Sequence, residues 1–340
     1  MGKAWVNDKP SSFRSVAIGS IDDLRVPVDG AACEIVQLGR GRLAGRLTRA
    51  SIGDVAFSLG AFSLPIRTTG VLSEARLTIG SLLRCANPVK SWSGALHPGS
   101  IIVIPPGADH CNVYSGAASF AGLSLDCIEI AMILGKECES SDPDYWSRRR
   151  VCRATSRCAA DQIEQRLLSI MACLVKPDTL TPSSADFLKR SVVETFAMHL
   201  LDTNAASTGS VIRSTFRIVK DVENYVDLRT HRPIHISEIC TSLNISRRTL
   251  HRAFDDVLGI GPSAFLRQKR LCSVHSALRR LDPKQTRVTD VATEFGFLEL
   301  GRFSQYYRQL FGEYPNETLK RGKLTRGGSS GFPAFDLILF

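Results

Sequence analysis

The 340-residue chain contains no run of eighteen consecutive apolar residues, the minimum that a membrane-spanning helix requires. Its first thirteen residues, MGKAWVNDKPSSF, lack the apolar segment of a secretory signal. Its ten cysteines are scattered from Cys33 to Cys272 without a CxxC pair, which argues against a disulfide framework or a zinc site. These absences predict a cytoplasmic protein with reduced thiols and no membrane contact, long enough to fold as two domains.

The sequence also lacks the ligand cluster of a metalloenzyme. His97 and His110 form no H-x-H pair and have no glutamate nearby, whereas a metal-binding barrel needs several such ligands. The segment Gly39-Arg40-Gly41-Arg42 lacks the GK[ST] ending of a phosphate loop, and its composition favours a hairpin turn. We therefore expect no catalytic residue, no metal and no cofactor, and we interpret both histidines as loop or rim residues.

One pattern occurs twice between Ile236 and Leu319. Each copy begins with a short amphipathic segment and a tight turn, and continues with apolar residues spaced four apart. The repeated apolar residues are Leu250, Phe254 and Leu258 in the first copy and Phe303, Tyr307 and Phe311 in the second. Both copies then have a glycine followed three residues later by a proline, which suits a helix C-cap and the start of the next helix. The pattern predicts two helix-turn-helix units, whose second helices enter the DNA major groove.

The positive charge of the chain is concentrated in the same region. The whole chain has a formal net charge of +10. The segment Arg213–Arg326 contains 21 Lys and Arg residues and 12 Asp and Glu residues, a net charge of +9. A basic surface alone is weak evidence, but together with the repeat it indicates a domain that neutralises phosphates.

Residues 216–320 resemble the tandem helix-turn-helix domain of the AraC/XylS family of transcription regulators. The family signature is most complete in the second copy, at Ala292, Gly296, Phe297, Phe303, Tyr307, Phe311, Gly312 and Pro315. The resemblance implies an all-α domain in which a linker helix, expected from Pro262 to Leu281, joins the two units. Gln305 departs from the family pattern, where arginine is common, and this departure implies a different base preference.

Base recognition is expected on the solvent face of each second helix, near its N-terminus. Alignment to the family motif places Arg248, His251 and Arg252 of the first copy at base-contacting positions. In the second copy Arg302 and Gln305 are the expected readers, because arginine pairs with guanine and glutamine with adenine. The alternative is that these exposed residues bind only phosphates.

Contacts to the DNA backbone are expected from residues beside these readers. They are Ser246, Arg247, Thr249, Tyr306 and Arg308. Ser246 also suits the N-cap of the first recognition helix. On the linker helix, Arg267, Lys269 and Arg270 are candidates for phosphate contact or plain solvent exposure. Arg270 has the further alternative of pairing with an acid in the core of the domain.

The N-terminal half has a different pattern. Residues 33–125 are strand-like, with alternation such as Val55, Phe57 and Leu59 and a short apolar run at Ile101–Ile104 between turn residues. Residues 126–201 have helical periodicity. The helices that it predicts either cover the sheet or pair with the same helices of a second subunit. The sequence therefore predicts an α+β protein: an antiparallel β sandwich or cupin-like barrel with following helices, then the all-α domain.

The domains expected are a sensor or dimerisation domain at 1–205, a linker at 206–215, the DNA-binding domain at 216–322 and a disordered tail at 323–340. The resemblance implies a transcription regulator, most often an activator in this family. Its expected partners are double-stranded DNA, RNA polymerase, a small-molecule effector and a second copy of the chain. The alternative is a cupin-type metalloenzyme with a DNA-binding appendage, which the missing ligand cluster opposes. A DNA-repair methyltransferase would need clustered cysteines, and Cys33 stands alone.

Overall fold

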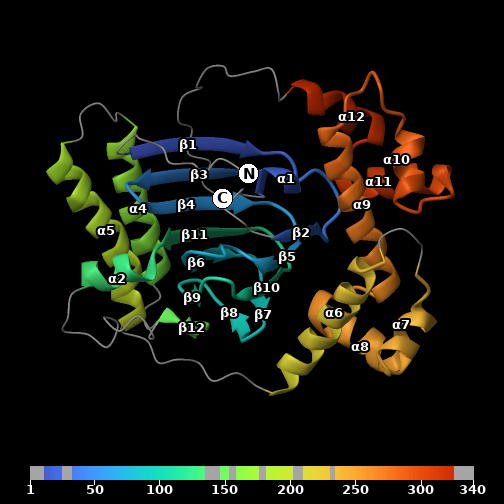
Figure 1. Ribbon diagram of the computed structural model, residues 1–340, viewed down its shortest axis with the longest axis horizontal. Helices are drawn as coiled ribbons and strands as arrows, with labels where there is room; N and C mark the ends of the chain where they lie inside the picture. Colours follow the sequence, from blue (N-terminus) through green and yellow to red (C-terminus); the bar gives the residue numbers. More distant parts are fainter. Residues whose placement is uncertain are drawn as a thin grey trace.

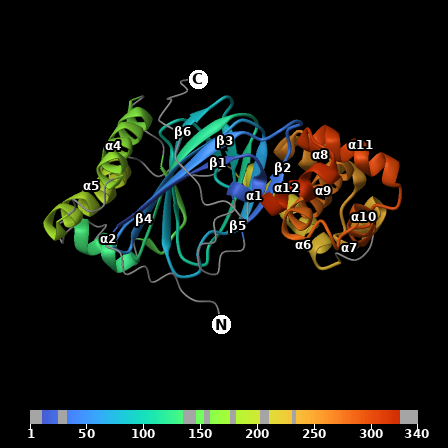
Figure 2. The same cartoon turned by 90° about the horizontal axis from the view of Figure 1, so that it is seen from above.

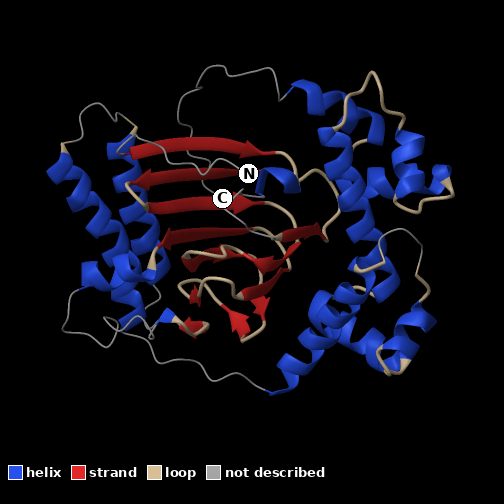
Figure 3. Ribbon diagram, in the orientation of Figure 1, coloured by secondary structure: helices blue, strands red, loops and turns tan. Residues whose placement is uncertain are grey.

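The computed structural model describes residues 11–24, 33–134, 146–152, 158–175, 181–201, 210–229 and 234–324. In these residues a β-rich N-terminal part is followed by a C-terminal part built from helices (Figures 1 and 3). Residues 206–209 of the predicted linker and 325–340 of the predicted tail lie outside the described residues. No helix of the described segments is both long and apolar enough to cross a membrane.

Two antiparallel sheets form the N-terminal part. The larger has the strand order β1-β3-β4-β11-β6-β9-β12 and the smaller the order β2-β5-β10-β7-β8. The strands are β1 (Ser11–Ile18), β2 (Glu34–Gln37), β3 (Gly45–Ile52), β4 (Val55–Phe62), β5 (Ile66–Val71), β6 (Leu77–Cys85), β7 (Val89–Ser91), β8 (Gly94–Leu96), β9 (Ile101–Ile104), β10 (Asp109–Tyr114), β11 (Ala118–Leu125) and β12 (Arg150–Cys152). Because the sheets are separate, the predicted sandwich is the alternative that the structure adopts, and not the closed barrel.

The larger sheet is covered on both faces. Along β4, Phe57 packs in the apolar cluster that includes Ile163 and Phe196, whereas Phe62 belongs to the cluster shared with the smaller sheet. Alternate residues of a strand point to opposite faces, so one strand serves both layers. The helices on the outer face are α2 (Cys127–Leu134), α4 (Ala159–Leu174) and α5 (Pro182–Leu201). Figure 2 shows these helices at one end of the molecule and the C-terminal helices at the other, beyond the smaller sheet.

The C-terminal part contains the two predicted helix-turn-helix units. Its helices are α6 (Ser210–Asp227), α7 (Ile236–Ser242), α8 (Arg247–Leu258), α9 (Pro262–Arg280), α10 (Val288–Glu294), α11 (Leu300–Phe311) and α12 (Pro315–Leu324). The recognition helices α8 and α11 both have twelve residues and both end at a left-handed glycine, Gly259 and Gly312. The long helix α9 joins the units, and α12 packs against it.

Local structure differs from the sequence pattern in three places. Ser11–Ile18, which precedes the strand-like segment 33–125, forms β1 and pairs with β3, and the helix α1 (Ile21–Leu24) follows it. Arg150–Cys152, within the segment predicted to be helical, forms β12 against β9. Both strands are fixed by distant partners, which local periodicity does not report. The helix α6 begins at Ser210, within the range 206–215 expected as the linker, because residues 210–215 contain no glycine or proline to stop it.

The predicted hairpin at residues 39–42 was also wrong. The strands on either side lie in different sheets, since β2 pairs with β5 and β3 pairs with β1 and β4. The loop is therefore a crossover between the sheets. It extends toward the C-terminal helices, where the backbone N–H of Gly41 donates to the carbonyl of Leu310 at 3.0 Å.

Candidate nucleic-acid interface

The first recognition helix, α8, exposes the residues predicted to read bases. Ser246 is its N-cap, with its Oγ accepting a hydrogen bond from the backbone N–H of Thr249 at 3.0 Å. Leu250 and Phe254 are fully buried against the rest of the domain. The opposite face is therefore turned to solvent, and it carries Arg248, His251 and Arg252. Arg252 lies 3.7 Å from Asp256 one turn later, and 82% of its side chain is exposed.

The second recognition helix, α11, has the same construction. Phe303 and Tyr307 are buried, while Arg302 and Gln305 are exposed. Its N-terminus differs, because Glu299 occupies the N-cap position without a capping side-chain hydrogen bond. The Glu299 carboxylate instead accepts from Arg302, with Nε and Oε2 3.0 Å apart. The predicted role of Arg302 as a base reader would require it to leave this ion pair.

The residues predicted to contact the DNA backbone have different surroundings. Ser246, Arg247 and Thr249 are exposed at the start of α8. Tyr306 is half-buried, with the Arg267 guanidinium 4.2 Å from the centre of its ring. Arg308 donates to the hydroxyl of Tyr314 at 2.6 Å, with its guanidinium also over that ring. The two α11 residues thus already have partners within the domain.

The linker helix α9 is less exposed than its sequence indicated. Lys269, considered a candidate for phosphate contact or solvent exposure, is only 6% exposed, and its Nζ lies 2.7 Å from Glu34 Oε2 and 2.9 Å from Asp227 Oδ2. We considered an acidic partner for Arg270, but in the structure Glu34 and Asp227 pair with Lys269 instead. Arg270 lies over the ring of Phe297 at 5.4 Å, and burial and then Arg267 lower its pKa. These corrections arise because β2 packs on α9.

Comparisons with known proteins agree with this geometry. Residues 239–321 match the model of a helix-turn-helix domain family. The probable thc operon regulatory protein of Rhodococcus erythropolis is 32% identical over 103 residues, covering 30% of this chain and 31% of the relative. The XylDLEGF operon transcriptional activator 3 of Pseudomonas putida is 23% identical over 288 residues, covering 77% and 83%.

A solved structure is similar over about the same share of the chain. A probable AraC family transcriptional regulator from Rhodopseudomonas palustris is 38% identical, with 31% of this chain and 97% of that chain covered and a TM-score of 0.29. The C-terminal part of this chain is an AraC-type helix-turn-helix domain. The matches span about a third of the length of the first curated relatives, so they describe this domain and not the whole protein.

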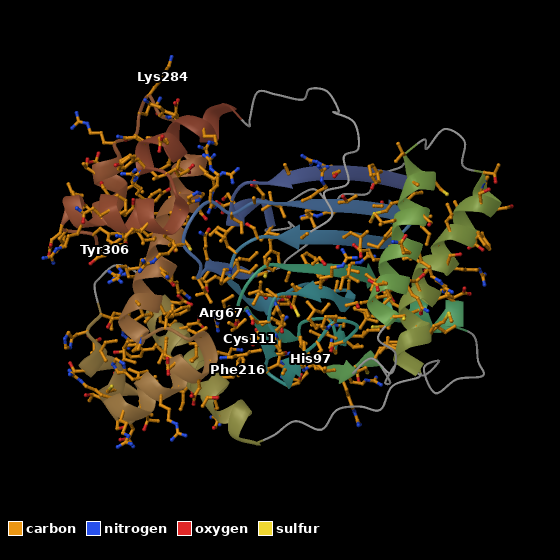
Figure 4. The ribbon with its side chains drawn as sticks, turned by 180° about the vertical axis from the view of Figure 1, so that it is seen from behind. Arg67, His97, Cys111, Phe216, Lys284 and Tyr306 are labelled. Atoms are coloured by element: carbon orange, nitrogen blue, oxygen red, sulfur yellow. The ribbon has the colours of Figure 1, made fainter. Side chains whose placement is uncertain are left out.

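The AraC-type domain is docked on the sandwich through buried charges that the sequence did not reveal. Arg67 on β5 forms an ion pair with Glu223 on α6, and both side chains are at least 95% buried. Arg67 also donates to the Sγ of Cys111 at 3.5 Å, and Figure 4 shows both residues on the side of the sandwich that faces the helices. Burial alone would lower the pKa of Arg67, but Glu223, Cys111 and Glu34 together outweigh it and raise that pKa. No local pattern pairs residues so far apart in sequence.

Both recognition helices contact the sandwich at their C-terminal ends. Lys90 Nζ donates to the carbonyl of Asp256 in α8 at 2.6 Å. Gln37 Nε2 donates to the carbonyl of Leu310 in α11 at 2.6 Å, beside the bond from Gly41. The last four carbonyls of a helix have no partner within it, so these bonds satisfy groups that are otherwise unpaired. The N-terminal ends that carry the predicted base readers remain free of these contacts.

A further charged cluster lies around His275 on α9. Its Nδ1 is 3.3 Å from Asp22 on α1, and its Nε2 is 3.7 Å from Glu313, which follows α11. Burial alone would lower the pKa of His275, but the hydrogen bonds to Asp22 and Glu313 outweigh it and raise that pKa. Burial raises the pKa of Glu313, but His275, Thr318, Arg321 and Arg42 together lower it to about 2. The cluster ties the sandwich to the AraC-type domain.

An apolar cavity of about 310 Å³ lies between the two sheets. His110, predicted to be a loop or rim residue, is instead buried in its wall, with Nδ1 2.6 Å from the carbonyl of Gly70 and Nε2 3.1 Å from the hydroxyl of Thr68. Burial lowers the pKa of His110 to about 4. His97 is exposed in the loop before β9, as predicted. Within the described segments, no three His, Cys, Asp or Glu side chains are grouped to hold a metal.

Proposed function

We propose that this protein is a sequence-specific DNA-binding regulator of transcription whose sandwich senses a small molecule. The observation that supports it best is the matched construction of α8 and α11. Each presents an exposed polar face beside a buried apolar ridge, and each ends at a left-handed glycine. We propose Arg248, His251, Arg252, Arg302 and Gln305 as base readers, and Ser246, Arg247, Thr249, Tyr306 and Arg308 as phosphate contacts.

The connection between the helices defines the expected DNA site. The 19 residues of α9 give a helix about 28 Å long at 1.5 Å per residue. Successive major-groove faces on one side of DNA are about 34 Å apart. The two recognition helices therefore fit adjacent grooves when the DNA bends slightly. One chain is expected to protect an asymmetric site of nearly two helical turns.

Replacing Arg252 tests base recognition with a closely matched control. Arg252→Ala is expected to relax base choice in one half of the site and to cost about 1–3 kcal/mol of binding free energy. Arg217 on α6 is 83% exposed and lies 3.8 Å from Asp221, so it resembles Arg252 in exposure and ion pairing. Arg217→Ala is expected to leave base preference unchanged. Selection from random oligonucleotides, followed by fluorescence anisotropy, measures both variants. Equal effects of the two variants on base preference would contradict the proposal.

We further propose that α4 and α5 pair with the same helices of a second copy. Their outer surface exposes Leu168, Phe187 and Met198, and large apolar side chains on an exposed helix pair favour association. Phe187→Glu is expected to shift the full-length protein from dimer to monomer in sedimentation equilibrium. A dimer of unchanged stability would contradict this interface.

The remaining partners follow from the role of a regulator. We propose that the protein acts in the cytoplasm, where it contacts RNA polymerase at the promoters that it controls. Several relatives are named as transcriptional activators, which supports activation over repression. Transcription in vitro with purified polymerase, with and without the protein, measures the sign of the effect.

A further inference from the structure

The cavity between the sheets has space because one face of the larger sheet carries small residues. Ser58 on β4, Gly122 on β11 and Gly80 on β6 are direct neighbours across three strands, and all three line the cavity. A Cβ atom added to Gly80 would meet no atom closer than the carbonyl oxygen of Ala121, at 4.0 Å. The opposite wall is apolar and includes Ile35 and Ile66 of the smaller sheet. A slim apolar molecule fits on this row of small residues.

The same row ends at a positive charge. Arg49 on β3 is the direct neighbour of Ser58 and also lines the cavity. Its Nε is buried without a hydrogen-bond partner, and no carboxylate of the described residues forms an ion pair with it. None of the residues that line the cavity is an aspartate or a glutamate. A half-buried guanidinium without a counter-charge is unfavourable, because burial weakens its solvation.

A second arginine makes the binding of an anion at Arg49 more favourable. Across the β1–β3 ladder, Arg14 is the direct partner of Arg49. Like charges directly opposite each other on neighbouring strands repel. Burial and then Arg14 lower the pKa of Arg49. An anion bound at Arg49 relieves both the desolvation and the repulsion.

Neutral polar groups complete the wall. Asn112 on β10 is more than 90% buried, and its Oδ1 lacks a hydrogen-bond partner. On the opposite wall, Ser124 Oγ of β11 is also buried without one. Unsatisfied buried groups of this kind are uncommon in folded proteins, and they mark places where a bound molecule or water completes the hydrogen bonding.

From these contacts we infer that the cavity binds an apolar monocarboxylic acid. Its carboxylate pairs with the Arg49 guanidinium, and its apolar body lies along Ser58, Gly122 and Gly80 beneath the smaller sheet. A carboxylate matches the forked geometry of arginine, and one negative charge matches the single guanidinium on the cavity wall. The inference rests on the proposed function, because it names the chemical class of the small molecule that the sandwich is proposed to sense.

Calorimetric titration of the full-length protein tests the ligand class. The probes are phenylpropanoic acid and hexanoic acid, each compared with its own uncharged primary amide. At least one acid is expected to bind at one molecule per chain, with its amide about tenfold or more weaker. Equal affinity for the acid and its amide, or no binding of either acid, would overturn the inference.

Variants of the cavity wall test where the acid binds. Arg49→Met is expected to reduce the affinity for the acid to that for the amide. It is also expected to raise the melting temperature of the unliganded protein, because it removes an unpaired buried charge. Gly80→Val is expected to abolish binding of acid and amide by filling the cavity.

Arg46→Met, at an exposed position of β3 that does not line the cavity, is the control and is expected to bind like the wild type. Unchanged acid affinity in Arg49→Met would overturn the assignment, and its melting temperature shows whether that variant is folded.

Measuring DNA affinity separately distinguishes this inference from the proposed function. If the acid binds through Arg49 but leaves DNA affinity unchanged, the ligand site stands and its role as effector site fails. If the protein binds DNA selectively but no acid enters the cavity, the regulator stands and the ligand class is wrong.

Discussion

At the scale of single residues, the contact between the sandwich and the helices depends on a few charges that are buried with their partners. Arg67 and Glu223 are both nearly inaccessible, so each is the main compensation for the other's lost hydration. Lys269 differs, because its partners Glu34 and Asp227 remain partly exposed. A buried pair contributes less to net stability than its geometry suggests, but it fixes one docking orientation, since any other leaves a charge unpaired.

His275 gives the molecule a predicted dependence on pH. Its pKa is raised in the folded protein, so its contribution to the free energy of unfolding is complete below its unfolded pKa, about 6.5. That contribution is lost as the pH rises through the higher folded pKa. We therefore expect the stability advantage of wild type over His275→Gln to be largest near pH 6 and to shrink toward pH 9. Urea unfolding of both proteins at several pH values measures the difference.

The groups that face His275 are favourable for this measurement. Glu313 has a lowered pKa of about 2, so its own contribution is lost only as the pH falls below its unfolded pKa and toward 2. Burial raises the pKa of Tyr307 well above its usual value, which keeps it neutral through the range. Arg321 and Arg42 also pair with Glu313. A stability difference that stays constant from pH 6 to 9 would show that His275 does not titrate in this range.

At the scale of elements, the ends of the two recognition helices form a matched pair. Gly259 and Gly312 have almost the same backbone conformation, with φ of 69° and 68°. A Cβ added to Gly259 would meet nothing within 4 Å, whereas one added to Gly312 would meet the backbone nitrogen of Arg42 at 3.0 Å. The end of α8 is therefore free at this point, and the end of α11 is pressed against the crossover loop of the sandwich.

Alanine at each position separates helix capping from docking. Gly259→Ala is expected to cost about 1 kcal/mol of unfolding free energy, because alanine disfavours the left-handed conformation. Gly312→Ala is expected to cost more, since the crossover loop must also shift. Urea unfolding of the full-length variants measures both costs. Equal losses of unfolding free energy would mean that the crossover loop shifts without cost and contributes little to docking.

The elements that the sequence predicted well are those with local signals. The helices α8 and α11 have four-residue apolar spacing and a glycine at the end, and both features act within one helix. The strand β1 lacks such a signal because its partner β3 lies far along the chain, with Ser15 opposite Thr48. His110 and Lys269 were misjudged for the same reason, since their burial depends on Thr68 and Glu34 from other parts of the chain. The exposed base readers are placed as predicted, and their contacts with DNA remain a prediction.

At the scale of the whole molecule, the sandwich holds the two helix-turn-helix units in one arrangement. Lys90 binds the end of α8, while Gln37 and Gly41 bind the end of α11. The helix α9 joins the two units and is itself packed against β2. Each unit is therefore fixed at two places, its connection to α9 and its contact with the sandwich. Such a molecule is expected to tolerate little change in the spacing of its half-sites.

Insertions between the half-sites of a selected DNA site test this rigidity. One extra base pair moves the second half-site by about 3.4 Å and rotates it by about a tenth of a turn. We expect this insertion to weaken wild-type binding about tenfold or more, because the units cannot follow it. The double variant Gln37→Ala, Lys90→Ala removes the side-chain bonds at both helix ends, with only the backbone bond from Gly41 left there, and is expected to lose less affinity. Arg84→Ala removes an ion pair between β6 and α4 within the N-terminal part and is expected to behave like the wild type.

Five extra base pairs turn the second half-site to the opposite face of the duplex, so all three proteins should then bind one half-site only. Fluorescence anisotropy measures each affinity, and a wild type that accepts the single insertion without loss would show that α9 and the sandwich leave the two units free to move.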